Sequence, residues 1–133
     1  MSLVALMALF AAGIGAGANA AKPALYLPKQ ASAGAKLYDA NCASCHGERL
    51  EGGVGPALSG RAFRTLAKDT KLTVGDVFSW VSVQMPLNQP ASLKKEQYVE
   101  IMAYLLKFNG YPAGSKPLSY DAANRSDLKM SPR

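Results

Sequence analysis

The stretch Cys42-Ala43-Ser44-Cys45-His46 is the most informative part of this 133-residue chain. It holds both cysteines of the chain and its only histidine, with two residues between the thiols and the imidazole directly after the second thiol. The pattern Cys-x-x-Cys-His is the attachment motif of haem c. At this spacing two thiols reach the vinyl groups on one edge of a porphyrin, and the adjacent imidazole ligates the iron. We therefore expect one covalently bound haem c, held by Cys42, Cys45 and His46.

Three other interpretations of this motif fit less well. A thioredoxin-like dithiol follows a strand of a βαβ unit, whereas the residues before Cys42 are helix-like. A structural zinc site takes four ligands, and two cysteines with one histidine supply only three. A disulfide, common between cysteines of exported chains, leaves His46 without a role. Haem attachment is the interpretation that uses all three side chains.

The second axial position of the iron is the next question. Because His46 is the only histidine, this position is filled by methionine, by another donor, or by nothing. Four methionines are poor candidates because they lie in the N-terminal segment, in a helical pattern or in a polar tail: Met1, Met7, Met102 and Met130. Met85 precedes Pro86, which disfavours helical backbone before it and favours an extended strap. We predict Met85 as the sixth ligand, with gap-filling in the core as the alternative.

The residues after the motif predict a loop beneath the haem. Glycines and a proline cluster from Gly47 to Gly60, a composition typical of irregular structure. We expect the Pro56 carbonyl to accept a hydrogen bond from one nitrogen of His46, so that the other nitrogen faces the iron. Leu58 is expected to press on the porphyrin. The alternative is a flexible surface loop.

The rest of the pattern is helical. We predict helices over 32–41, 74–83 and 93–108, with Ser32, Thr73 and Ser92 as N-caps. The last helix is expected to end at Asn109-Gly110 and to bury an apolar stripe. No stretch alternates as a strand does, so the predicted fold class is all-α.

A glycine and two aromatic residues in these helices lead to further predictions. Gly34 costs roughly 1 kcal/mol in a helix, and we expect it to allow a close crossing of the first and last helices. Phe78 and Trp80 are expected to be core residues that form a dry wall beside the haem.

The two ends of the chain differ from the middle. Residues 1–20 carry no charge and end in Ala18-Asn19-Ala20, the small-x-small form of a signal-peptidase site. The apolar run is shorter than the roughly 20 residues that cross a bilayer, so we expect a cleaved signal peptide and export to the periplasm, with a retained anchor as the alternative. Residues 111–133 are predicted to be an extended wrap or a partly disordered tail.

The formal net charge of +6 is spread over the chain beyond residue 20. Lys and Arg stand singly or in one pair, without a basic arm or a nucleic-acid-binding motif, so nucleic acid is not an expected partner. A basic surface of this kind favours electrostatic steering toward an acidic protein partner.

Together these motifs resemble the class I c-type cytochromes, the cytochrome c-like family with a single haem. The motifs are Gly34-x-x-x-Tyr38, Cys42-x-x-Cys45-His46-Gly47, Gly55-Pro56-x-Leu58, Met85-Pro86 and Ile101-x-x-Tyr104. The resemblance implies a cytochrome c-like fold over 21–110, with short helices around one haem c. It also implies that the terminal helices cross at Gly34, that Pro56 accepts from the proximal histidine, and that Met85 is the sixth ligand.

More narrowly, the segment from Met85-Pro86 to Gly114 is similar to bacterial cytochromes linked to periplasmic or membrane-bound dehydrogenases. That similarity implies a non-catalytic electron carrier, with a dehydrogenase as donor and an oxidase or another cytochrome as acceptor. One alternative is a cytochrome subunit fixed in a dehydrogenase or oxidase complex, associated with the membrane through that complex or through a retained N-terminal segment. Another is a haem enzyme or gas sensor with an open sixth position.

Overall fold

The computed structural model describes residues 21–133, so the predicted signal peptide or anchor over 1–20 lies outside the described residues. Within 21–133 the helices are α1 (Pro28–Asn41), α2 (Ala43–His46), α3 (Gly60–Asp69), α4 (Val74–Gln84), α5 (Lys95–Phe108) and α6 (Tyr120–Asn124). This part of the chain has isolated β-bridges but no strand. The all-α prediction is confirmed. None of the described helices is long and apolar enough to cross a membrane.

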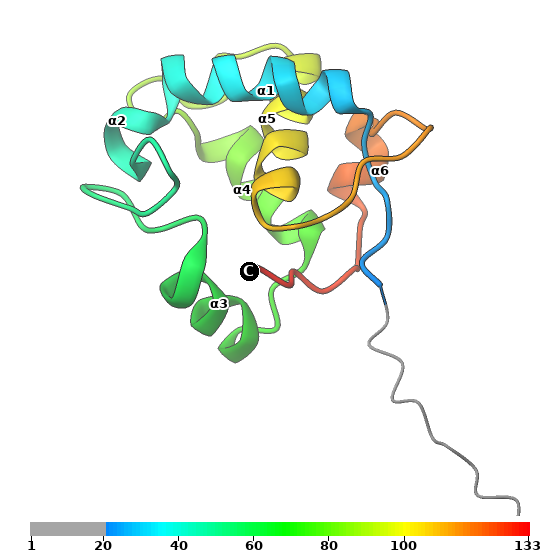
Figure 1. The fold of residues 1–133 in the computed structure, drawn as a ribbon. Helices are drawn as coiled ribbons and strands as arrows, with labels where there is room; N and C mark the ends of the chain where they lie inside the picture. The colour runs from blue at the N-terminus through cyan, green and yellow to red at the C-terminus, as the bar shows by residue number, and fades with distance from the viewer. Residues whose placement is uncertain (1–20) are drawn as a thin grey trace, which may run out of the picture.

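The fold is organised around the crossing of α1 and α5, where α1 lies across α5 at the top of the molecule (Figure 1). Gly34 sits at the crossing point and is buried. A Cβ atom at this position would overlap with the backbone carbonyl of Glu100 in α5. The lack of a side chain at Gly34 therefore allows the two backbones to touch, as the sequence predicted.

Two predicted N-caps are wrong. Helix α1 begins at Pro28, not Ser32, and α5 begins at Lys95, two residues after the predicted start at Leu93. In each case the freed backbone N–H of the N-cap donates to a glutamine side chain three residues later, from Leu27 to Gln30 at 3.0 Å and from Lys94 to Gln97 at 2.9 Å. A glutamine at this position satisfies the helix start without a serine cap.

The start of α4 follows the prediction. The hydroxyl of Thr73 accepts a hydrogen bond from the Asp76 backbone N–H at 3.0 Å, and the Asp76 carboxylate accepts from the Thr73 N–H at 2.8 Å. These reciprocal bonds form a capping box. They hold the pKa of Asp76 below its usual value, because the carboxylate form accepts both the side-chain and backbone hydrogen bonds of Thr73.

Helix α3 was not predicted from the sequence. The irregular segment after Gly47 is present, but a helix of ten residues follows it from Gly60. Its buried side chains are Phe63 and Ala67, one helical turn apart, and the rest of the helix is largely exposed. Helix α3 lies at the end of the molecule opposite α1 (Figure 1).

The C-terminal segment 111–133 lies against the helical core and contains the short helix α6. Backbone N–H groups at the start of α4 donate to it, from Val74 to Leu128 at 2.8 Å and from Gly75 to Ser126 at 2.9 Å. Its buried hydrophobic residues are spaced far apart in a polar sequence: Tyr111, Leu118, Ala123 and Met130. Because these residues are isolated, the segment has no hydrophobic periodicity that would predict a helix or its buried side. The sequence therefore predicted only a wrap or a disordered tail.

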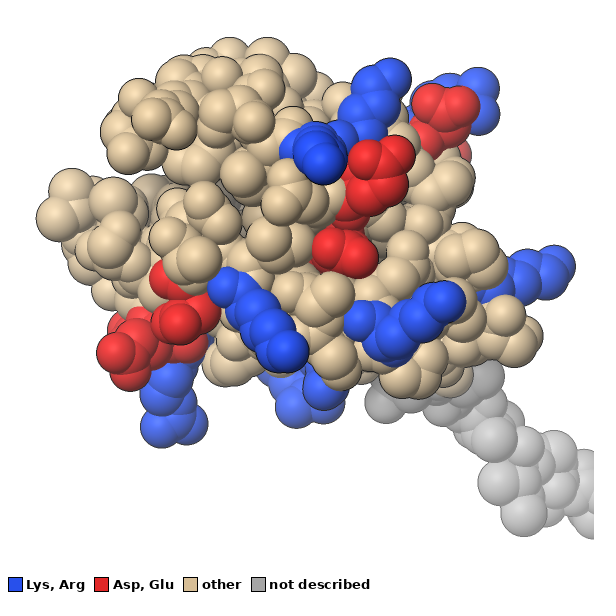
Figure 2. All heavy atoms as spheres, turned by 90° about the horizontal axis from the view of Figure 1, so that it is seen from above, with Lys and Arg blue, Asp and Glu red and all other residues tan. Residues whose placement is uncertain are grey.

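The surface carries its charge unevenly. Figure 2 shows basic and acidic side chains along one part of the molecule and a side, at the upper left, without either. Among the described residues, the longest segment without a charged side chain runs from Val77 to Leu93.

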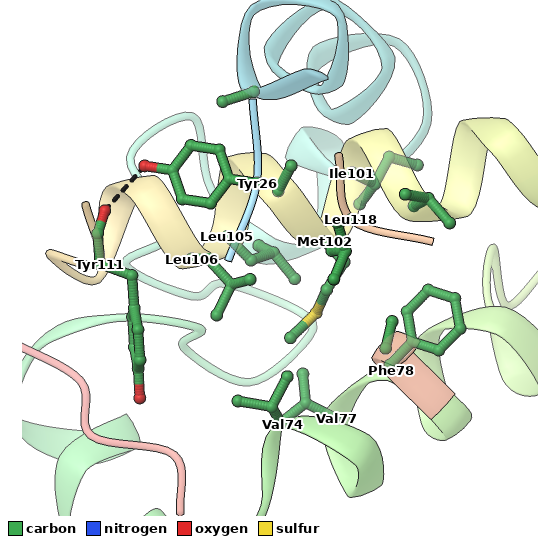
Figure 3. Packing of buried hydrophobic residues seen from close by; sticks show 14 of the residues in the cluster. Tyr26, Val74, Val77, Phe78, Ile101, Met102, Leu105, Leu106, Tyr111 and Leu118 are labelled. Carbon is green, nitrogen blue, oxygen red and sulfur yellow. Dashed lines mark hydrogen bonds between the residues drawn. The ribbon is translucent and has the colours of Figure 1, made fainter. Parts of the chain in front are cut away.

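The buried core is formed mainly by α4 and α5 with the segments at both ends of the domain. Phe78, Met102 and Leu106 are fully buried, and Met102 points from α5 toward Val74 and Val77 of α4 (Figure 3). The Tyr26 hydroxyl donates to the Tyr111 carbonyl at 2.7 Å, also drawn in Figure 3. The core thus ties residues before α1 to residues after α5.

Candidate haem site

A cavity of about 830 Å³ lies between the loop after α2 and the segment after α4. All six residues predicted from the sequence line it: Cys42, Cys45, His46, Pro56, Leu58 and Met85. The fold therefore brings together side chains that are up to 43 positions apart in the sequence. The walls are completed by Ile101 and Leu105 from α5, and by Trp80 and Val81 from α4.

The two thiols lie at the junction of α1 and α2. Cys42 separates the two helices, and the single turn of α2 places Cys45 and His46 on the cavity side. Both cysteines are free thiols. Burial, and secondarily the charge of Cys45, raise the pKa of Cys42 to about 11.

The imidazole of His46 is held by the loop that follows it. Its Nδ1 lies 2.8 Å from the Pro56 carbonyl oxygen, so Nδ1 carries the proton and donates, because a carbonyl only accepts. Nε2 is then left with its lone pair free to bind a metal. This contact is the one predicted from the sequence.

The glycines of this loop have a steric function. The Gly55 N–H donates to the Cys45 carbonyl at 2.9 Å, and the Gly52 N–H donates to the His46 carbonyl at 2.8 Å. A Cβ at Gly55 would lie 2.9 Å from Cε1 of the His46 ring, closer than side-chain atoms ordinarily approach. The loop can therefore fold back against the histidine only with glycine at this position.

Met85 lies on the segment that leaves α4. Its backbone is extended, with φ −113° and ψ 154°, as expected for a residue before proline. The hydroxyl of Tyr98 in α5 donates to the Met85 carbonyl at 2.7 Å and accepts from the Leu93 N–H at 3.2 Å. We call residues 85–93 the strap. Tyr98 thus fastens both ends of the strap to α5.

Tyr98 is a site residue that sequence reasoning missed. It was predicted only as part of the apolar stripe of the last helix, and its ring is indeed buried, with 3% of its surface exposed. The signal that was available is its hydroxyl, because a buried tyrosine requires a hydrogen-bond partner. The position of that partner depends on the path of the strap, which the sequence does not specify.

The walls of the cavity carry several exposed apolar side chains, including one of the two predicted core aromatics. Phe78 is a core residue, as predicted, but does not line the cavity; Trp80 lines the cavity wall, as predicted, but is 64% exposed and so is not a core residue. Leu87 and Val54, which also line the cavity, are 75% and 94% exposed. Large exposed apolar side chains around one cavity are unusual unless a ligand or partner covers them.

The donor set is consistent with haem c. Two free thiols, an imidazole oriented through its other nitrogen, a thioether and apolar walls are what a covalently bound porphyrin iron requires. Among residues 21–133, no group of three or more His, Cys, Asp and Glu side chains is placed to hold a metal ion by itself. The residues therefore fit a haem better than a bare ion.

Comparison with known proteins gives concordant results. Residues 29–105 match the family model described as cytochrome c oxidase, cbb3-type, subunit III. Cytochrome c-552 from Schinkia azotoformans is 80% identical over 23 residues, which are 17% of this chain and 43% of that protein.

A similar solved structure is that of sulfane dehydrogenase SoxCD from Paracoccus pantotrophus. The match has a TM-score of 0.53 and 25% sequence identity, and it covers 76% of this chain and 58% of that chain. The chain thus spans only about half the length of the relatives it matches.

Proposed function

Because this chain belongs to the cbb3-type cytochrome c oxidase subunit III family and is a c-type cytochrome, we propose that it carries single electrons from a dehydrogenase to a respiratory acceptor. The observation that carries the proposal is the hydrogen bond between His46 Nδ1 and the Pro56 carbonyl, inside a cavity that Met85 also lines. That bond orients the imidazole so that its Nε2 could serve as an axial ligand of the iron. The acceptor class in the proposal is an oxidase or another cytochrome.

Different residues of the chain would hold different parts of haem c. Cys42 and Cys45 would form the thioether bonds to the porphyrin, and Nε2 of His46 would bind the iron. Met85 would offer its thioether from the strap, and Leu58 and Ile101 would supply apolar walls. Bound haem c supplies an iron centre that alternates between the ferrous and ferric states.

Methionine at the second axial position suits electron transfer better than catalysis. A thioether is a soft ligand that favours ferrous iron and raises the potential. If His46 and Met85 both held the iron, no position would remain for oxygen or peroxide. This is why we favour a carrier over a haem enzyme or gas sensor with an open sixth position.

A second candidate is a cytochrome subunit fixed in a larger complex. It is favoured by the names of the matched proteins, an oxidase subunit family and the SoxCD dehydrogenase. In either form we propose that the protein is exported to the periplasm, on the basis of the small-x-small site at Ala18-Asn19-Ala20. Co-purification from native membranes distinguishes the two, because a fixed subunit remains with its complex through gel filtration and a carrier does not.

The proposal is tested by matched methionine variants of the haem-loaded protein. Met85→Leu removes the thioether from the cavity, whereas Met102→Leu makes the same change in the buried core on α5. We expect a reversible one-electron wave in the wild type and in Met102→Leu. Met85→Leu should have a lower potential, no Met-to-iron charge-transfer band in the ferric state, and rapid binding of carbon monoxide in the ferrous state. Equal spectra for both variants would exclude Met85 as ligand, and absence of covalent haem would exclude the function.

A further inference from the structure

The polypeptide places no charged side chain around the haem cavity. Among residues 21–133, no Lys, Arg, Asp or Glu lines this cavity. The strap that forms one side of it belongs to the charge-free segment from Val77 to Leu93. Figure 2 shows a side of the molecule without basic or acidic side chains. This arrangement differs from the basic docking surface expected from the net charge.

The exposed side chains at the mouth are apolar or neutral. Leu87 comes from the strap and Val54 from the loop after α2, and 75% and 94% of their surfaces are exposed. Asn88 and Gln89 lie beside Leu87 and also line the cavity. We call these four residues the rim. The rim joins the two segments that carry Met85 and His46, so a protein seated on it lies close to both axial positions.

Four of the fifteen basic residues lie together on a segment away from the cavity. The segment from Gly60 to Lys71, which is α3 and the turn after it, contains four basic residues and one acidic residue. Its basic residues are exposed, and none of them lines the cavity: Arg61, Arg64, Lys68 and Lys71. Contact with an acidic surface through α3 would therefore not bring the rim against that surface.

On the basis of the proposed function, we propose that the electron-transfer partner docks on the rim through an uncharged, largely apolar patch around its own redox centre. A charged patch on the partner would lose its hydration against the rim without gaining an ion pair. Because salt screens only charge interactions, electron transfer through the rim is nearly independent of ionic strength. The steering of an acidic partner, expected from net charge alone, does not act at this surface.

The test uses the haem-loaded protein on gold electrodes coated with alkanethiol monolayers of equal length. One monolayer presents mixed methyl and hydroxyl groups, and the other presents carboxylates. We expect fast electron transfer on the uncharged monolayer, changing less than about twofold between roughly 20 and 500 mM salt. On the carboxylate monolayer, α3 holds the rim away from the electrode, and the rate is at least about tenfold lower.

Lysine variants test which surface is used. Leu87→Lys and Val54→Lys place a charge on the rim, and each should lower the rate on the uncharged monolayer by about tenfold, since an ammonium group resists desolvation. Leu66→Lys makes the same change on α3, at an exposed leucine away from the cavity, and should leave the rate unchanged. Because all three positions are exposed, the variants are expected to fold.

The outcomes separate the two proposals. A faster rate on carboxylate than on the uncharged monolayer, or rim variants that behave like Leu66→Lys, overturns the docking surface. A soluble mediator reports on the haem itself without docking. If the mediator detects no reversible one-electron couple in the wild type, the proposed function fails as well, whatever the monolayers show.

Discussion

Replacing Tyr98 with phenylalanine should loosen the strap that carries Met85. The change removes one hydroxyl and leaves the buried ring in place. That hydroxyl makes two hydrogen bonds, to the Met85 carbonyl at 2.7 Å and from the Leu93 N–H at 3.2 Å. A hydrogen bond of this kind contributes about 1 kcal/mol net. The loss of both costs about 2 kcal/mol, which corresponds to roughly a 30-fold change in an equilibrium constant.

The effect is measured by competition for the iron. Under the proposed ligation by Met85, external imidazole binds ferric haem only when Met85 has left it, so its apparent affinity reports how easily the strap opens. For Tyr98→Phe we expect imidazole to bind about 30-fold more tightly than to the wild type. The potential should also fall, because the ferrous state depends on the thioether.

Tyr104→Phe is the matched control. Tyr104 lies on the same helix, and among residues 21–133 its hydroxyl has no hydrogen-bond partner, although its ring packs at a tilt against that of Tyr38, with the ring centroids 5.3 Å apart. We expect this variant to bind imidazole like the wild type. Equal imidazole affinity in Tyr98→Phe and Tyr104→Phe would refute the view that Tyr98 fastens the strap.

Two further predictions concern the frame around the site. Gly34→Ala forces α1 and α5 apart, because the added methyl group overlaps with the Glu100 carbonyl; we expect a loss of about 3 kcal/mol in denaturant unfolding, and a loss below 1 kcal/mol would contradict the crossing. Thr73→Ala removes the N-cap of α4 and should cost about 1 kcal/mol in the same assay. The hydrogen bonds of Thr73 lower the pKa of Asp76, so the stability they add is complete above the unfolded-state pKa of about 4 and is lost as pH falls through the lower folded-state pKa. Unfolding measured from neutral to acidic pH should show a smaller acid-dependent loss in Asp76→Asn, and an unchanged pH profile would argue against this linkage.

Several features could be predicted because their causes are local in sequence. The Thr73 and Asp76 capping box involves four consecutive residues, and the extended backbone at Met85 follows from the proline next to it. The start of α1 has local signals too, Pro28 at the first helical position and Gln30 three residues after Leu27, although Ser32 was predicted as the cap instead. What could not be predicted is that the Gln30 side chain also donates to the Leu118 carbonyl at 2.8 Å and accepts from the Leu118 N–H at 2.9 Å. A contact across 88 positions leaves no local pattern.

The sequence by itself determined that this is a c-type cytochrome, because the spacing of Cys42, Cys45 and His46 is dictated by covalent chemistry within five residues. It determined the all-helical class separately, because no stretch alternates as a strand does. It also indicated the loop carbonyl and the methionine, since glycine permits the sharp turns of the loop after His46 and proline restricts the backbone of the residue before it. Only the tertiary structure decided how the strap is fastened to Tyr98 and that the cavity mouth is uncharged. These properties depend on which distant segments meet, and net charge or periodicity does not record where side chains lie in space.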